Sequence, residues 1–270
     1  MTLPEGLADR VRALRAGTIA PAEPRDAATV LLLRDTATGP EAYLLRRVRG
    51  MAFAGGMHVF PGGSVDPADA GAEVGWTGPP PAQWAGWLGC DEPLARALVC
   101  AAVRETFEES GVLLAGPSPT EVLADVSTDE WEAERTALEA REQSLSELLA
   151  RRGLVLRADL LRPLAHWITP EVEPKRFDTR FFLAELPTGQ VCREAGSEAD
   201  QRLWARPADA LADGLRMMPP TAAALEQVRD APDVAAALAV PRRLTPVMPV
   251  LELDEDGRTV LRHPGADGAS

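Results

Sequence analysis

Three glutamates with the spacing of one helix face lie in the segment 104–111, which reads RETFEESG. Glu105, Glu108 and Glu109 are related by i, i+3 and i+4, a spacing that brings Cβ atoms to about 5–6 Å on a helix. The C-terminal end of a helix carries partial negative charge, so each acid there costs roughly 0.3–1 kcal/mol without a cation nearby. Arg104 can pair with Glu108, but one arginine cannot neutralise three acids.

A hard divalent cation would satisfy both the crowded acids and the helix end. Mg²⁺ is commonly held by carboxylates together with water and substrate phosphate oxygens. The segment therefore predicts a metal site that faces a phosphate-bearing ligand. The alternative is an acidic helix face that only contacts solvent.

The residues before the glutamates have the start, the stop and the apolar face of a long helix. Asp91 is a capping residue, Pro93 suits a first helical turn, and Gly111 suits the left-handed position after a helix. At 100° per residue the apolar side chains gather on a face away from the glutamates. The pattern predicts a helix that ends at residue 110, with one face for packing and one for chemistry.

Short apolar runs on both sides of this helix predict strands. They cover residues 28–35, 41–48, 57–60, 163–169, 176–186 and 202–205. Residues 120–152 predict two or three amphipathic helices, and two further helices are expected near 207–214 and 221–239, before a C-terminal hairpin. Strands interrupted by helices predict an α/β sandwich of one domain that carries insertions.

Composition excludes several classes of protein. The formal net charge is −13 and no basic stripe is present, so nucleic acid is not expected as a partner. The first 17 residues lack the 7–15-residue apolar run of a signal peptide, and nothing in the chain predicts a membrane span. The cysteines, Cys90, Cys100 and Cys192, lack metal-site or disulfide spacing. These features predict a reduced, cytoplasmic protein.

At residues 104–112 the sequence resembles the second half of the Nudix box, R-E-U-x-E-E-x-G-U, where U is apolar. FPGG at residues 60–63 resembles the glycine loop that begins the box. Thr106 occupies one apolar position, and many more residues than usual separate Gly63 from Arg104. The glutamate expected between them has no clear equivalent, because counting back from Arg104 reaches Arg96 and counting forward from Gly63 reaches Asp69.

Membership of this family implies an α/β/α sandwich with a mixed β-sheet and a hydrolase that cleaves a diphosphate with Mg²⁺ or Mn²⁺. The expected organisation is an N-terminal helical extension over residues 1–25, a single Nudix domain over 26–262 and a flexible tail over 263–270. Insertions are expected at about 66–90, as a Pro- and Trp-rich loop, and at 118–153, as helices.

The resemblance also implies roles for individual residues. Glu105, Glu108, Glu109 and the backbone carbonyl of Gly62 are the expected metal ligands, and Arg104 is expected to orient the glutamates. Either Glu109 or Glu198 is expected to act as the general base.

Longer stretches resemble a subgroup of Nudix proteins related to coenzyme A and acyl-coenzyme A diphosphatases, which makes these compounds the leading substrates. Arg46, Arg47 and Arg176 are the candidate phosphate-binding residues, with Lys175 beside the last. ADP-ribose or NADH is an alternative substrate, and a non-catalytic ligand-binding module is another possibility. Many relatives self-associate, so a homodimer is also considered.

Overall fold

A mixed β-sheet forms the centre of the chain. The computed structural model describes residues 6–50, 54–70, 74–193, 199–254 and 259–262, and in those ranges the main sheet has eight strands. They are β1 (Arg25–Thr36), β2 (Gly39–Arg47), β3 (His58–Val59), β4 (Gly62–Ser64), β8 (Leu161–Ile168), β9 (Phe177–Glu185), β10 (Ala199–Ala205) and β11 (Pro246–Val247). The order is β10-β2-β1-β9-β8-β11, with β3 beside β2 and β4 beside β1. The β1–β9 and β8–β11 pairs are parallel and the others antiparallel.

The strand β1 lies in the middle of this sheet because its sequence is apolar on both faces. Residues 30–33 are four consecutive aliphatic residues, all with 0% exposure. Such runs are typical of strands covered on both sides. The two faces of β1 accordingly belong to different cores, one containing Val30 and Leu32 and the other Leu31 and Leu33.

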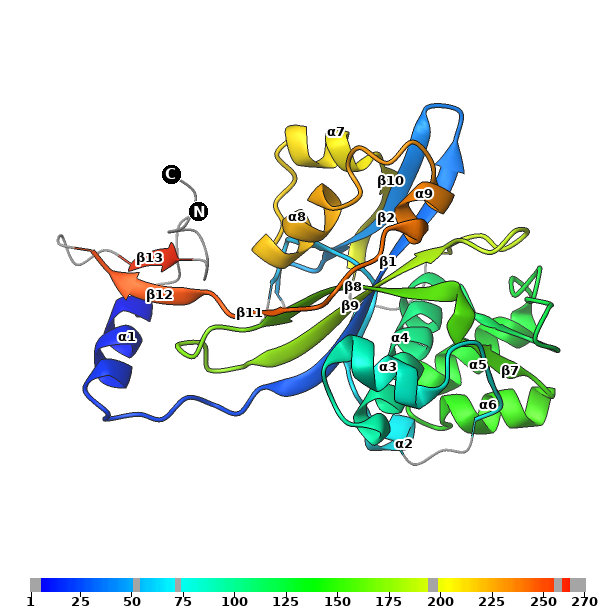
Figure 1. The fold of residues 1–270 in the computed structure, drawn as a ribbon, viewed down its shortest axis with the longest axis horizontal. Coiled ribbons are helices and arrows are strands. Elements are labelled where there is room, and N and C mark those ends of the chain that lie inside the picture. The colour runs from blue at the N-terminus through cyan, green and yellow to red at the C-terminus, as the bar shows by residue number, and fades with distance from the viewer. Residues whose placement is uncertain (1–5, 51–53, 71–73, 194–198, 255–258, 263–270) are drawn as a thin grey trace.

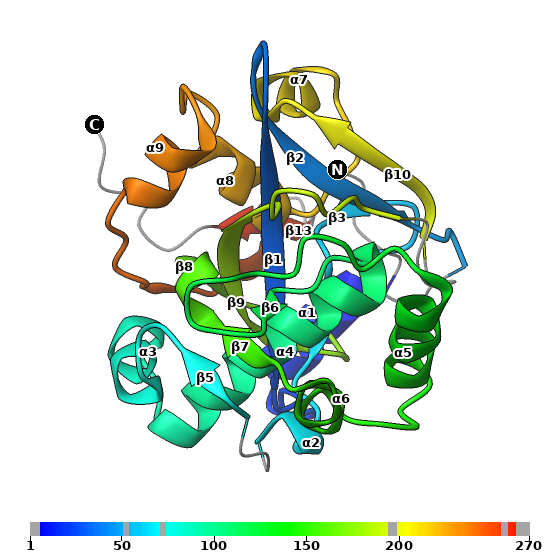
Figure 2. The ribbon, with the colours of Figure 1, turned by 90° about the vertical axis from the view of Figure 1, so that its right-hand side faces the viewer.

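Helices cover both faces of the sheet, which confirms the predicted sandwich (Figures 1 and 2). One layer contains α3 (Pro81–Leu88) and α4 (Glu92–Ser110). The other contains α7 (Pro207–Ala212), α8 (Pro219–Glu226) and α9 (Val234–Ala239). The single helix expected near 221–239 is divided in two, and Pro232, which cannot donate a helical hydrogen bond, lies between the halves.

The Pro- and Trp-rich segment differs from the surface loop that its composition predicts. It contains α2 (Pro67–Ala70), β5 (Trp76–Thr77) and α3. Trp84 has 0% exposure, and its ring centroid lies 5.7 Å from that of Phe182 on the sheet. The tryptophans of this segment therefore help to build the core beneath α4.

The second insertion forms helices, as its sequence predicts. It contains α5 (Asp129–Glu139) and α6 (Leu145–Arg152), and α6 begins with a capping box between Ser144 and Glu147. A small sheet, β5-β7-β6, joins β6 (Ala115–Gly116) and β7 (Val155–Arg157) to the first insertion, and a 3₁₀ helix (Ala158–Leu160) leads into β8. The two insertions are thus in contact beside α4, the helix that carries the three glutamates.

The N-terminal helix α1 (Leu7–Arg15) packs against the hairpin of β12 (Val250–Leu253) and β13 (Thr259–Arg262), at the left of Figure 1. Leu7 and Val11 contact Val172 and Leu251 there. The tail predicted over 263–270 lies outside the described residues. Across the described residues, no helix combines the length and the apolar character needed to cross a membrane.

Candidate active site

The helix α4 carries the glutamates, and its ends are set by local chemistry. The Asp91 side chain accepts a hydrogen bond from Leu94 N at 2.9 Å, and Gly111 ends the helix with a φ of 72°. Thr106 is fully buried, yet its hydroxyl donates to the Ala102 carbonyl at 2.7 Å. That bond satisfies the hydroxyl, so a threonine fits where the family pattern has an apolar residue.

The glycine loop lies directly against the glutamate face. Gly62 and Gly63 are in β4, which pairs with β1. The Gly62 amide donates to Glu109 Oε2 at 2.9 Å. A Cβ on Gly63 would lie 2.6 Å from the Glu105 carboxyl carbon, closer than real Cβ contacts. Glycine at residue 63 is therefore needed for the close approach of the loop to Glu105.

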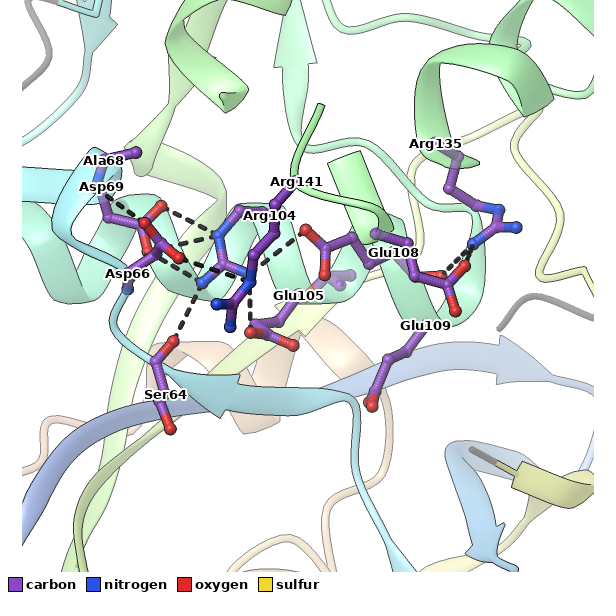
Figure 3. Close-up of polar contacts among 12 residues, drawn as sticks. Ser64, Asp66, Ala68, Asp69, Arg104, Glu105, Glu108, Glu109, Arg135 and Arg141 are labelled. Carbon is purple, nitrogen blue, oxygen red and sulfur yellow. Dashed lines mark hydrogen bonds and ion pairs between the residues drawn. The ribbon is translucent and has the colours of Figure 1, made fainter. Parts of the chain in front are cut away.

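Arg104 connects the two halves of the box (Figure 3). Its Nη1 donates to Glu105 Oε1 at 2.7 Å and to Glu108 Oε1 at 3.2 Å, which confirms the predicted pairing with Glu108. Its Nη2 donates to the Ser64 carbonyl at 3.0 Å. Burial alone would lower the pKa of Arg104, but the hydrogen bond to Asp69 and the surrounding carboxylates raise it, so the guanidinium stays charged.

Asp69 is the acidic partner of Arg104 from the other half of the box. It lies on α2, its side chain is 2% exposed, and it accepts from Arg104 Nη2 at 2.8 Å and from Nε at 3.0 Å. Arg96, the other possible equivalent, instead donates to the Val74 carbonyl at 3.3 Å. Asp69, which is reached by counting forward from Gly63, is thus the acid that contacts Arg104 beside the glutamates. The additional residues between the two halves of the box lie after Asp69 in the sequence.

The pKa of Glu108 shows that the carboxylates are crowded. Burial, followed by the charge of Glu105, raises the Glu108 pKa from 4.5 to about 7, while Arg104 acts in the opposite direction. A carboxylate with this pKa is only partly ionised at neutral pH. An added cation would favour its ionised form.

A second arginine, not expected from the sequence, lies at the C-terminal end of α4 (Figure 3). Arg135 on α5 is 5% exposed, and its Nη1 donates to the Glu108 carbonyl at 2.8 Å. It also pairs with Glu132 at 2.6 Å and Glu139 at 2.8 Å. Positive charge at a helix C-terminus is stabilising, so Arg135 of the helical insertion places a cation at the end of α4 where the glutamates are unfavourable. No local sequence signal links residues 27 positions apart in this way.

The donor chemistry of the cluster fits a hard cation. Three carboxylates on one helix face, beside a glycine loop, are the oxygen ligands that Mg²⁺ and Mn²⁺ take. Among the described residues, however, no three His, Cys, Asp or Glu side chains are gathered in the arrangement of a finished metal site. Glu105 and Glu108 turn toward Arg104, and Glu109 toward Gly62. Binding of a cation would require the carboxylates to turn away from these partners.

The three candidate phosphate-binding arginines lie in different surroundings. Arg47 lines a cavity of about 910 Å³ that also contains the glutamates. Arg46 pairs with Asp200 at 2.7 Å and is not part of the cavity wall. Arg176 is 7% exposed and donates to the carbonyls of Thr169 and Ala22 at 3.0 and 2.7 Å. Unlike the prediction, Arg176 anchors the chain before β1 and does not line the cavity, whereas its neighbour Lys175 does.

The cavity combines the polar cluster with apolar walls. Aromatic and aliphatic side chains line it as well, among them Trp167 and Phe181 of the main sheet, Phe60 of the glycine loop, Met218 before α8 and Leu251 of β12. Its volume falls in the range of small-molecule sites, about 300–1,000 Å³. Glu198, the second candidate for the general base, lies outside the described residues.

Comparisons with known proteins agree with this geometry. Residues 89–220 match the family model of the NUDT19 Nudix domain. Acyl-coenzyme A diphosphatase NUDT19 of Gallus gallus is 29% identical over 237 residues, which cover 69% of this chain and 62% of that protein. The chain thus spans somewhat under two thirds of the length of this curated relative.

A solved structure is similar to this chain over most of its length. The crystal structure of a Nudix hydrolase from Alicyclobacillus acidocaldarius has a TM-score of 0.71 and 31% sequence identity with this chain. The match covers 82% of this chain and 98% of the other. The chain therefore belongs to the Nudix hydrolase family.

Proposed function

We propose that the protein hydrolyses the diphosphate bond of coenzyme A or an acyl-coenzyme A, releasing 3',5'-ADP and 4'-phosphopantetheine or its acyl derivative. The observation that carries the proposal is the convergence of Glu105, Glu108 and Glu109 with Arg104 and the glycine loop in one cavity. The name of the relative NUDT19 supports the choice of substrate. The apolar walls suit the pantetheine arm and an acyl chain better than a second sugar.

Glu105, Glu108 and Glu109 would hold the divalent cation, with the carbonyl of Gly62 as a further ligand. A bound Mg²⁺ or Mn²⁺ neutralises charge on phosphoryl oxygens and lowers the pKa of water. Arg104 orients Glu105 and Glu108 through its Nη1, and Asp69 holds Arg104 in place. Arg47 lies on the cavity wall, where its guanidinium can bind a phosphate.

In this proposal Glu109 removes a proton from the attacking water. Its Oε2 accepts a hydrogen bond from the Gly62 amide, which fixes the position of the carboxylate. Glu198 remains the alternative base. The two phosphate monoesters, 3',5'-ADP and 4'-phosphopantetheine or its acyl derivative, leave along the cavity, and the apolar walls limit the access of other water molecules.

The decisive experiment is product analysis by mass spectrometry. The protein is incubated with Mg²⁺ or Mn²⁺ and, separately, coenzyme A, an acyl-coenzyme A, ADP-ribose or NADH. We expect 3',5'-ADP from the first two, and a fall of roughly 100-fold in rate for Glu108→Gln, as for the loss of one preorganised electrostatic group. Glu92→Gln is the matched control, because Glu92 is an exposed acid at the other end of the same helix.

Other results would lead to different conclusions. Release of AMP from ADP-ribose or NADH, without cleavage of coenzyme A, would support the proposed catalytic site and refute coenzyme A as the substrate. Full activity in Glu108→Gln would remove the proposed metal site. Binding of a diphosphate without turnover would favour a non-catalytic module.

Two further predictions complete the proposal. The three cysteines are free thiols, which supports a reducing compartment such as the cytoplasm. Self-association into a homodimer remains a prediction, and light scattering of the purified protein measures it directly.

A further inference from the structure

One end of the cavity has a chemistry that the hydrolysis of a diphosphate does not require. Arg25 begins β1, Phe177 begins β9, and the two are Cα partners in the parallel β1–β9 pair. Lys175 lies just before β9, and its Nζ is 5.3 Å from the centroid of the Phe177 ring. All three residues line the same cavity as the glutamates. Two cations and an aromatic ring from neighbouring strands are therefore brought together there.

The two cations lack the acidic partners that most arginines of this acidic protein have. Arg104 pairs with Asp69, and Arg46 pairs with Asp200. Within the ranges that the structure describes, no carboxylate lies within 4.0 Å of the Arg25 guanidinium or the Lys175 ammonium. Both side chains are exposed. Their charge is thus available to a ligand in the cavity.

One acid shares this end of the cavity. Glu173 lines the wall, and burial raises its pKa, while the charge of Arg10 acts in the opposite direction. The Glu173 carboxylate does not reach either cation. Among the charged residues that line this end of the cavity, two cations, Arg25 and Lys175, therefore stand beside one acid, in a chain whose total charge is −13.

The position of these cations relative to the glutamates limits the ligand. Ala28 on β1 is the Cα partner of Gly63, which lies against Glu105. Arg25 is three residues earlier on the same strand, so its Cα is about 10 Å from that point at about 3.3 Å per residue. A ligand that binds at both places must therefore carry a negative charge in addition to its diphosphate.

We propose that Arg25, Lys175 and Phe177 form a subsite for a nucleoside that carries a phosphate on its ribose in addition to the 5'-diphosphate. In this subsite Arg25 and Lys175 bind the ribose phosphate, and the Phe177 ring stacks on the base. The subsite rests on the proposed function, because it assigns the nucleotide half of the substrate to this end of the cavity. It makes a 3'-phosphoadenosine group the feature that distinguishes the substrate from ADP-ribose and NADH.

The test measures binding of nucleotides that have no diphosphate to cleave. Calorimetry in the presence of Mg²⁺ compares 3',5'-ADP with 5'-AMP, using wild-type protein and the double variant Arg25→Gln/Lys175→Gln. We expect wild type to bind 3',5'-ADP more tightly, and the double variant to lose about tenfold in affinity for each cation, as for hydrogen bonds to charged groups. The affinity for 5'-AMP should stay within about twofold.

A matched double variant controls for the change in net charge. Arg229→Gln/Arg243→Gln removes two positive charges from residues that do not line the cavity, and it should bind both nucleotides like wild type. Phe177→Leu should weaken both nucleotides by a similar factor of about fivefold or more, because stacking acts on the base alone.

Three results would overturn the subsite. They are equal affinity of wild type for the two nucleotides, equal loss of both in Arg25→Gln/Lys175→Gln, and no loss in that variant. Turnover measured in parallel separates the two proposals. Failure to cleave coenzyme A, together with cation-dependent binding of 3',5'-ADP, would refute the proposed function and keep the subsite. Cleavage of coenzyme A with no preference over dephospho-coenzyme A would support the proposed function and refute the subsite.

Discussion

Replacing Asp69 tests whether the two halves of the interrupted Nudix box act as one unit. The Asp69 side chain is 2% exposed and the Arg104 side chain 12%, so Asp69→Ala leaves a buried guanidinium without its main partner. Breaking a buried pair costs about 3–5 kcal/mol. Arg104 keeps its bonds to Glu105, Glu108 and Ser64, so we expect the lower limit, about 3 kcal/mol.

The effect should be visible in both stability and metal dependence. For a domain of this size, about 3 kcal/mol lowers Tm by roughly 6–12 °C. Once Asp69 is absent, the Arg104 guanidinium is balanced only by Glu105 and Glu108, and it competes more strongly with a cation for them. We therefore expect the Mg²⁺ concentration for half-maximal activity to rise. Thermal denaturation by circular dichroism and a Mg²⁺ titration of hydrolysis measure the two effects.

Two further variants make this test specific. Asp69→Glu restores the residue type of the family pattern and keeps the charge, so it should retain most of the activity. Arg96→Gln changes the other possible equivalent and should leave the Mg²⁺ dependence unchanged. A Tm for Asp69→Ala within about 2 °C of wild type, with an unchanged Mg²⁺ requirement, would refute the reasoning.

Three other changes test the surroundings of the glutamates. Arg135→Leu removes the buried donor to the Glu108 carbonyl, so it should lower the free energy of unfolding by about 1.5–3 kcal/mol and lower kcat at saturating Mg²⁺. An unchanged kcat would contradict a role of Arg135 in positioning α4. Gly63→Ala should displace Glu105 and lower kcat by about 100-fold, whereas Gly86→Ala, with no atom within 4 Å of the new Cβ, should not. In metal-free protein the Glu108 pKa of about 7 exceeds its ordinary 4.5. Between these pH values the folded state therefore binds more protons than the unfolded state. The free energy of unfolding should accordingly fall as pH rises from 4.5 to 7. Urea denaturation across this range should show the fall in wild type and not in Glu108→Gln, and a parallel fall in both would rule out Glu108 as its source.

The parts of the fold and site that sequence predicts are those with local patterns. The helix α4 has a cap at Asp91, an apolar face and a glycine stop at Gly111, and the glutamate spacing follows from helix geometry alone. The strand β1 is recognisable as a buried run of aliphatic residues. These features need no knowledge of distant parts of the chain.

The parts that sequence does not predict depend on contacts between distant residues. Arg176 and Arg135 are both buried arginines, but one binds the carbonyl of Ala22 and the other that of Glu108. Nothing in the neighbouring residues indicates which carbonyl each will reach. Trp84 likewise lies in a proline-rich segment that is typical of loops, yet apolar area on α4 and β9 is sufficient to bury it.

The parallel pairing of β1 with β9 has a consequence for the order in which the protein folds. The strand β1 is synthesised well before its parallel partner β9, which begins only at Phe177. Contacts between residues this far apart form slowly because a long loop must close first. During synthesis β1 can pair with β2 and pack against α4, but the N–H and C=O groups along its other edge stay unpaired until β9 is made. The cavity wall that contains Phe177 and Phe181 is therefore completed late, and the emerging chain exposes an unpaired strand edge until then.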